Sequence, residues 1–206
     1  GKAEFEHHKV CIDNQGFAQL RPIAQASSHH NIARLYDLGH GDEQGFEAKE
    51  AAFGHYKACI DHPGFAQLPP ANQAHSHYNI ARLYNLGHGD EQESEAKEAA
   101  FGHIKACIAH QGFAQLAPVY QATSHLLIAR LYNQGHGDKQ GPEAQKAEFE
   151  HHKACIDNQG FAQLAPLYQG ITHAGIAKLY RLGGGDKQGS EAGKAAFGHY
   201  KTCIDH

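Results

Sequence analysis

Lys57-Ala58-Cys59-Ile60 returns as Lys105-Ala106-Cys107-Ile108 and again as Lys153-Ala154-Cys155-Ile156. The cysteine in this stretch belongs to a series with a constant spacing of 48 residues. The series contains all five cysteines of the chain: Cys11, Cys59, Cys107, Cys155 and Cys203. A fixed period of this length is typical of a repeat protein. The repeat therefore decides the fold, since each unit must bury its apolar face against its neighbours.

Three further motifs share this period. Gly-Phe-Ala-Gln-Leu begins at residues 16, 64, 112 and 160, and Ile-Ala-Arg/Lys-Leu-Tyr begins at residues 32, 80, 128 and 176. Gly-His-Gly-Asp begins at residues 39, 87 and 135, and 183–186 read Gly-Gly-Gly-Asp. Segment 1–14 aligns with 49–62 and with 193–206. We therefore interpret 1–206 as one repeat domain, with a surplus helix at 1–14 and units at about 15–62, 63–110, 111–158 and 159–206.

Two helices are expected in each period. We term the helix that contains the repeated cysteine the B-type helix, and place it at about 47–61, where alanines and Cys59 follow one helical stripe. Gly64 ends this segment. We term the helix with the Ile-Ala-Arg/Lys-Leu-Tyr motif the A-type helix.

The A-type helix is expected at about 70–86. Pro70 suits the first helical turn, where a missing N–H costs nothing, and Gly87 suits a left-handed C-terminal cap. Two helices of about 16 residues and two short connections fill the period. The sequence thus predicts an all-α fold, an αα-hairpin solenoid of 48-residue repeats.

These motifs resemble the Sel1-like repeat family, which is related to tetratricopeptide repeats. Ile80-Ala81 and Tyr84 match the first helix of that family, Gly87-His88-Gly89 match its Gly-x-Gly turn, and Lys57-Ala58-Cys59 match its second helix. The resemblance implies a right-handed superhelix that acts as a scaffold for protein–protein interaction, without catalysis. This unit is longer than the family's usual repeat, because Gly-Phe-Ala-Gln-Leu-x-Pro is inserted, and it carries one cysteine where cysteine-rich members carry a pair.

Composition excludes several classes of partner. The chain has 18 basic and 22 acidic residues, a formal charge of −4 with neutral histidines. Nucleic acid is bound by basic surfaces, so we expect no nucleic-acid partner, and no apolar run approaches the roughly 18 residues of a membrane span. The 19 histidines are unusual, and they predict sensitivity to pH between about 5 and 7.

The cysteines are expected to be unpaired and buried. Equivalent positions of adjacent repeats should lie about 10 Å apart, whereas a disulfide requires Cα atoms within about 7 Å. A free cysteine most often packs as a small apolar residue.

A zinc site is the alternative interpretation of the B-type helices, because histidine and cysteine at i, i+4 and i+7 share one helical face. The candidate ligands form three trios: His55, Cys59 and His62; His103, Cys107 and His110; His199, Cys203 and His206. Asn14 and Asn158 replace the third member in the other units, and no fourth ligand is evident.

Glutamine and histidine recur four residues apart in every A-type helix, so each pair is expected to touch. The pairs are Gln25 and His29, Gln73 and His77, Gln121 and His125, and Gln169 and His173. Two interpretations remain open: a hydrogen-bond ladder that fixes the register of the repeats, or a pH-gated or ligand-binding concave stripe. Beside them, Ser28, Ser76, Ser124 and Thr172 are expected to bond the preceding helical turn.

We expect a non-enzymatic scaffold for protein partners, because no catalytic set recurs in a suitable context. Neither end of the chain resembles a polar cap, which favours self-assembly of copies head-to-tail into a fibre or extended array. Since residue 1 is Gly and no signal segment is visible, we expect a processed form or part of a longer product. A metal- or cofactor-binding protein, with zinc on the His/Cys positions, is the alternative, and no cofactor is otherwise expected.

Overall fold

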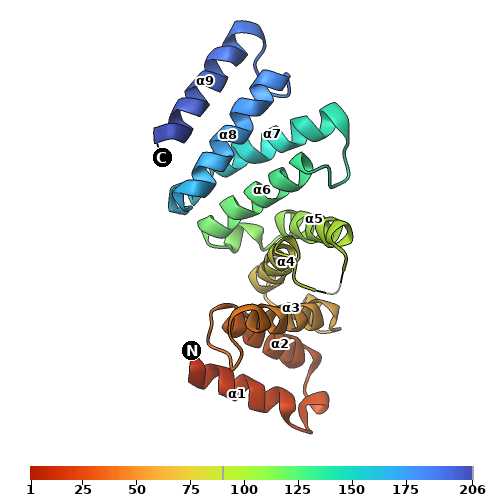
Figure 1. Ribbon diagram of the computed structural model, residues 1–206. Coiled ribbons are helices and arrows are strands. Elements are labelled where there is room, and N and C mark those ends of the chain that lie inside the picture. Colours follow the sequence, from red (N-terminus) through yellow and green to blue (C-terminus); the bar gives the residue numbers. More distant parts are fainter. Residues whose placement is uncertain (90, 206) are drawn as a thin grey trace. The chain divides into compact units, whose positions relative to one another are not determined.

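The computed structural model describes residues 1–89 and 91–205, and the side chains of these residues except 204 and 205. Within these ranges every regular element is helical, so the expected all-α fold is confirmed (Figure 1). The chain divides into two compact units, Gly1–Gln115 and Leu116–His206, which are described separately.

Both helix types form in every period. The B-type helices are α1 (Lys2–Asp13), α3 (Gly45–Asp61), α5 (Glu93–Ala109), α7 (Gly141–Asp157) and α9 (Gly189–Asp205). The A-type helices are α2 (Pro22–Asp37), α4 (Pro70–Asn85), α6 (Pro118–Asn133) and α8 (Pro166–Leu182). Four short 3₁₀ turns, within the Gly-Phe-Ala-Gln-Leu motifs, connect them: η1 (Phe17–Gln19), η2 (Phe65–Gln67), η3 (Phe113–Gln115) and η4 (Phe161–Gln163).

Each A-type helix packs along the B-type helix that follows it. In the first unit α2 pairs with α3 and α4 with α5, and in the second unit α6 pairs with α7 and α8 with α9 (Figure 1). The contacts from a B-type helix to the next A-type helix are less extensive, at α1/α2, α3/α4 and α7/α8. The hairpin is therefore an A-type helix, a Gly-x-Gly turn and a B-type helix.

Proline and glycine set the ends of the A-type helices as expected. A proline occupies the first turn of all four, and the glycine after helix α4, Gly87, has φ +84°. The left-handed turn lets the His88 amide donate to the Leu83 carbonyl at 3.1 Å, which satisfies a terminal carbonyl of the helix.

The glycine of Gly-Phe-Ala-Gln-Leu has a role beyond ending a helix. A Cβ added to Gly64 would lie 2.1 Å from the Pro22 carbonyl oxygen, and one added to Gly112 would lie 2.0 Å from that of Pro70. Gly160 lies equally close to the backbone of Pro118. The connecting segment thus rests directly on the start of the preceding A-type helix. We call this contact the glycine joint.

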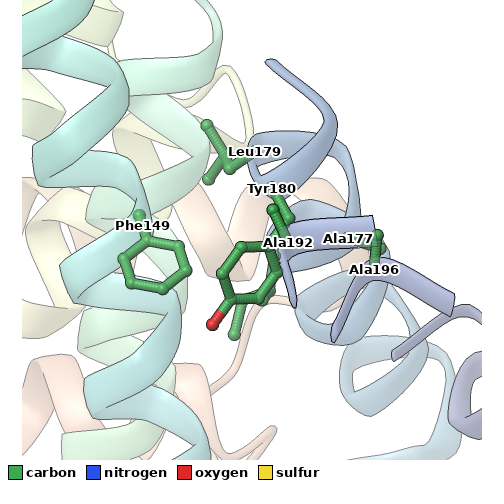
Figure 2. Packing of buried hydrophobic residues seen from close by; sticks show 7 residues of the cluster. Phe149, Ala177, Leu179, Tyr180, Ala192 and Ala196 are labelled. Atoms are coloured by element: carbon green, nitrogen blue, oxygen red, sulfur yellow. The ribbon is translucent and has the colours of Figure 1, made fainter. Parts of the chain in front are cut away.

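Aromatic and small residues make the core between repeats. In the second unit, Phe149 of α7 meets Tyr180 of α8 edge-on, with ring centroids 5.2 Å apart (Figure 2). Ala192 and Ala196 of α9 complete this cluster, which lets the helices approach closely. The same edge-on contact joins Phe5 to Tyr36 and Phe53 to Tyr84 in the first unit.

Gly112→Ala should destabilise the protein by on the order of 2–3 kcal/mol, because the new methyl group meets backbone that cannot move aside. Gly102→Ala is the matched control. It lies in the exposed middle of α5 with nothing within 4 Å of its added Cβ, and should stabilise the protein by about 0.5–1 kcal/mol. Chemical denaturation measures both, and equal effects would contradict the glycine joint.

Candidate functional site

Every hairpin contains a hydrogen bond between two histidines, one from each helix. The bonded atoms are both Nδ1, and their separations are similar in the four hairpins. The pairs are His29 and His55 at 3.0 Å, His77 and His103 at 3.0 Å, His125 and His151 at 3.1 Å, and His173 and His199 at 2.9 Å. Because an Nδ1–Nδ1 hydrogen bond needs one donor and one acceptor, each pair holds a single proton between its rings.

A tyrosine stacks on each pair. In the first hairpin, the rings of Tyr36 and His55 are 5.9 Å apart and 14° from parallel, and Phe17 meets His29 edge-on at 5.7 Å. The Tyr36 hydroxyl donates to Asp42 Oδ1 at 2.7 Å, which ties the stack to the Gly-His-Gly-Asp turn. Tyr84, Tyr132 and Tyr180 stack on the other three pairs. We call a histidine pair with its tyrosine a histidine column.

The histidine columns favour neutral imidazole. Burial, followed by the charge that the partner histidine would carry, lowers the pKa of His55, His77 and His151 to about 4. Burial also lowers the pKa of His29 and His125. Near pH 7 the column is therefore an uncharged, internally hydrogen-bonded element between two helices.

The glutamines of the predicted ladder have other partners than the histidines four residues later. Gln25 Nε2 donates to the Leu20 carbonyl at 2.8 Å, and Gln25 Oε1 lies 3.0 Å from His62 Nε2. Gln73 contacts Leu68 and His110 in the same way. In the second unit, Gln121 accepts from Asn158 Nδ2 at 3.2 Å, and Gln169 donates to the Leu164 carbonyl at 2.8 Å. The glutamines thus hold the connecting segments.

The zinc trios are divided among different partners. His55 bonds His29, Cys59 packs against Ala26, and His62 turns toward Gln25. In the next hairpin His103 bonds His77 and His110 bonds Gln73, and His206 of the third trio lies outside the described residues. Among the described residues, no three His, Cys, Asp or Glu side chains form a group that could hold a metal ion.

Histidine and asparagine are equivalent at the third position of the trio. His62 Nδ1 accepts from the Gly64 amide at 3.0 Å, and Asn158 Oδ1 accepts from the Gly160 amide at 2.8 Å. Both side chains also reach the preceding glutamine. The alternation of the two residues therefore follows from a shared capping role rather than from metal binding.

The described cysteines form no disulfide, as expected. Cys59, Cys107 and Cys155 are completely buried, whereas Cys11 and Cys203 are half-buried. Burial raises the pKa of Cys59 and Cys155 to about 11, so these thiols are poor nucleophiles near pH 7. The neighbouring hydroxyls of Ser28, Ser124 and Thr172 bond the preceding helical turn, as predicted, whereas Ser76 Oγ lies 2.9 Å from His30 Nδ1.

One buried acid lies outside the histidine columns. Glu148 and His152 of α7 are 3% and 2% exposed, and Glu148 Oε1 lies 3.9 Å from His152 Nε2. Gly175 of α8 makes room for this imidazole, since an added Cβ would lie 2.3 Å from its Nε2. Burial raises the pKa of Glu148 and lowers that of His152 to about 4, which favours the neutral form of both. Closed off from solvent, the pair is not placed for catalysis on a substrate.

Sequence reasoning missed half of each histidine column. His7, His55, His103, His151 and His199 recur in all five B-type helices, and this spacing is visible in the sequence. Three of them belong to the predicted zinc trios, and His151 belongs to none of the predicted sites. The signal was the separation of 26 residues between each A-type histidine and its B-type partner.

No family model matches the chain, and no match was found among curated proteins or solved structures. In the part of the chain that the structure describes, none of the helices has both the length and the apolar character of a membrane span.

Acidification should loosen the fold. The unfolded chain binds protons to histidine near pH 6.5, whereas the folded pKa of His77 is about 4. The free energy of unfolding should therefore be highest above pH 6.5 and fall as the pH decreases toward 4. At pH 5 we expect a loss on the order of 1 kcal/mol for each such histidine. Thermal unfolding at pH 7.5 and pH 5.0 measures it.

The double variant His77→Asn/His103→Asn should lose less free energy of unfolding between pH 7.5 and pH 5.0 than the wild type, since asparagine retains hydrogen-bonding groups but does not titrate. His110, Lys57, Asp61 and Glu91 face this pair and remain unchanged. His7→Asn, on the exposed surface of α1, is the control and should leave the pH dependence unaltered. An equal loss in the double variant and the wild type would show that this column does not sense pH.

The reactivity of each thiol should depend on whether it is buried. In the native protein a chromogenic disulfide reagent should react with Cys11 and Cys203, because Cys59, Cys107 and Cys155 have no access to solvent. All five should react in denaturant. Rapid labelling of all five in the native state would contradict the buried positions.

Proposed function

We propose that the protein is a non-catalytic scaffold of the Sel1-like kind that binds helices of protein partners. The observation that carries this proposal is the outer face of α9. Phe197 on this face is 72% exposed, whereas its equivalents Phe5, Phe53 and Phe149 are 1%, 7% and 4% exposed. A large apolar side chain that is buried in its equivalents marks an interaction surface.

The chemistry of the partner follows from what covers the equivalent residues. The tyrosine of an A-type helix covers each of them, with ring centroids 4.9 Å apart for Phe5 and Tyr36 and 4.8 Å apart for Phe53 and Tyr84. The same helix contributes the isoleucine, alanine and leucine of its motif to the core. We therefore expect the α9 face to accept a helix with the Ile-Ala-Arg/Lys-Leu-Tyr pattern.

A second copy of the chain is able to supply this helix. In its own chain α2 is covered by α1, a shorter helix of 12 residues that buries only Phe5 among its described side chains. Helix α9 has 17 residues, with Phe197 and Lys201 at the positions of Phe5 and Lys9. Exchange of α1 for α9 of another copy would continue the 48-residue period between copies. Such an assembly would be the head-to-tail array that the sequence favours.

The uses of the remaining polar groups support a scaffold rather than an enzyme. The histidines of the columns bond each other, and the described cysteines at the centres of the hairpins are buried. The zinc alternative is left aside, because its trios are divided among different partners. Scaffolding is also the role that the resemblance to Sel1-like repeats implies.

A labelled peptide of residues 63–86, which contains η2 and α4, should bind the full chain, and the Tyr84→Ala peptide should bind at least tenfold more weakly. Phe197→Ala in the protein should weaken the wild-type peptide similarly. Leu86→Ala in the protein is the control, because Leu86 is also exposed but lies at the end of an A-type helix. Equal binding of both peptides would exclude the α9 face as the docking surface.

Self-assembly is tested separately from peptide binding. Sedimentation velocity over a concentration range, with electron microscopy of the same samples, should show growing linear species in the wild type. Phe197→Asp should remain monomeric, because a carboxylate cannot be buried against tyrosine without a large cost. Monomers of the wild type at every concentration, together with peptide binding, would restrict the function to heterologous partners.

A further inference from the structure

A pocket of about 470 Å³ lies in the second unit, between the first half of α7 and the turn that joins α8 to α9. Pro142, Gln145, Lys146 and Phe149 line one side. Leu182 and the backbone of 183–186 line the other.

The equivalent place in the first unit is filled by a side chain. His88, in the turn between α4 and α5, packs on Phe46 with ring centroids 4.9 Å apart. Its Nδ1 lies 2.8 Å from Glu50 Oε1, and the Gly89 amide donates to the same oxygen at 3.4 Å. His88 is only 7% exposed. A ring and a carboxylate therefore close the gap between this turn and α3.

All the side chains that fill this gap differ in the second unit. Gly184 replaces His88, Pro142 replaces Phe46, and Lys146 replaces Glu50, each 96 residues further along the chain. The pocket thus lacks the His88 ring and the Glu50 carboxylate, and a lysine stands at the aligned position of that glutamate. Gly185, which aligns with Gly89, still lines the pocket.

We propose that this pocket binds a small aromatic monocarboxylate. The ring occupies the space that His88 fills in the first unit, against Phe149 and Leu182, and the carboxylate pairs with the Lys146 ammonium. A concave, mostly apolar cavity with a few polar groups is the usual form of a small-molecule site. A charge-assisted hydrogen bond to the carboxylate fixes the orientation.

The acidic groups at the rim restrict the charge of the ligand. Asp186 accepts from the Tyr180 hydroxyl at 2.7 Å and lies 3.3 Å from Lys153 Nζ, so these two charges largely offset each other. Glu150 also lines the pocket. With two lysines and two carboxylates the lining has no net charge, so one negative charge beside Lys146 is tolerated, whereas a phosphate dianion would be repelled by the carboxylates.

The absence of tryptophan from the chain allows a direct test. Indole-3-acetate is the probe, and its fluorescence anisotropy is measured as the full-length protein is added. We expect a saturable rise, and at least fivefold weaker binding of the uncharged indole-3-acetamide. No saturable rise with the acid would overturn the proposal, and equal binding of the amide would overturn its carboxylate part.

Two variants locate the site. Lys146→Gln, an exposed position, should weaken indole-3-acetate about fivefold without affecting the fold, because one charge-assisted contact is lost. Gly184→Asn should abolish binding by refilling the pocket, with circular dichroism to confirm the helix content. Unchanged affinity in Lys146→Gln would overturn the assigned charge contact, and unchanged affinity in both variants would place binding elsewhere.

The first unit provides the converse control. His88→Gly opens the same space beside Glu50, whose negative charge should keep indole-3-acetate out. Binding of the acid there as tight as in the second unit would contradict the role given to Lys146. This test does not depend on the α9 face, so its result and that of the scaffold proposal are separable.

Discussion

The glycine joint is the constraint on which the repeat depends. The connecting segment lies so close to the first residue of the preceding A-type helix that only a residue without Cβ fits at Gly64, Gly112 and Gly160. The inserted Gly-Phe-Ala-Gln-Leu-x-Pro segment is thus a structural part of each unit. The glutamine bonds to the connecting segment and to the histidine or asparagine cap reinforce the contact, and they fix one repeat against the next.

A core with no tryptophan or methionine needs other means of specifying how its helices pair. Alanines permit close packing, but their small apolar side chains do little to fix the register of two helices. The histidine columns fix it, because a hydrogen bond between two half-buried imidazoles forms only at one register of the A-type and B-type helices. The tyrosine stacked on each pair extends this constraint to the following turn through Asp42 in the first hairpin.

Much of the fold could be predicted from the sequence, because its signals are local. Pro70 and Gly87 mark the two ends of their helix as the structure has them. The candidate site was harder to predict from the sequence, since side-chain partners depend on how the helices pack. Gln25 and His29 are correctly spaced to touch within one helix, yet a connecting segment and a second helix offer each a better partner. Gly184 interrupts the Gly-His-Gly-Asp motif, yet nothing in the sequence indicates that the change opens a pocket.

The glycine joint and the glutamine bonds also bear on how the chain folds. In the described part of the chain, the side-chain hydrogen bonds between repeats join residues no more than 46 positions apart, as in His62 with Gln25 and His30 with Ser76. Topologies built from such local contacts have a small entropy of loop closure and fold quickly. Any hairpin is able to serve as the nucleus, and its neighbours then add one at a time. The folding transition state should thus be distributed over several alternative starting points along the chain.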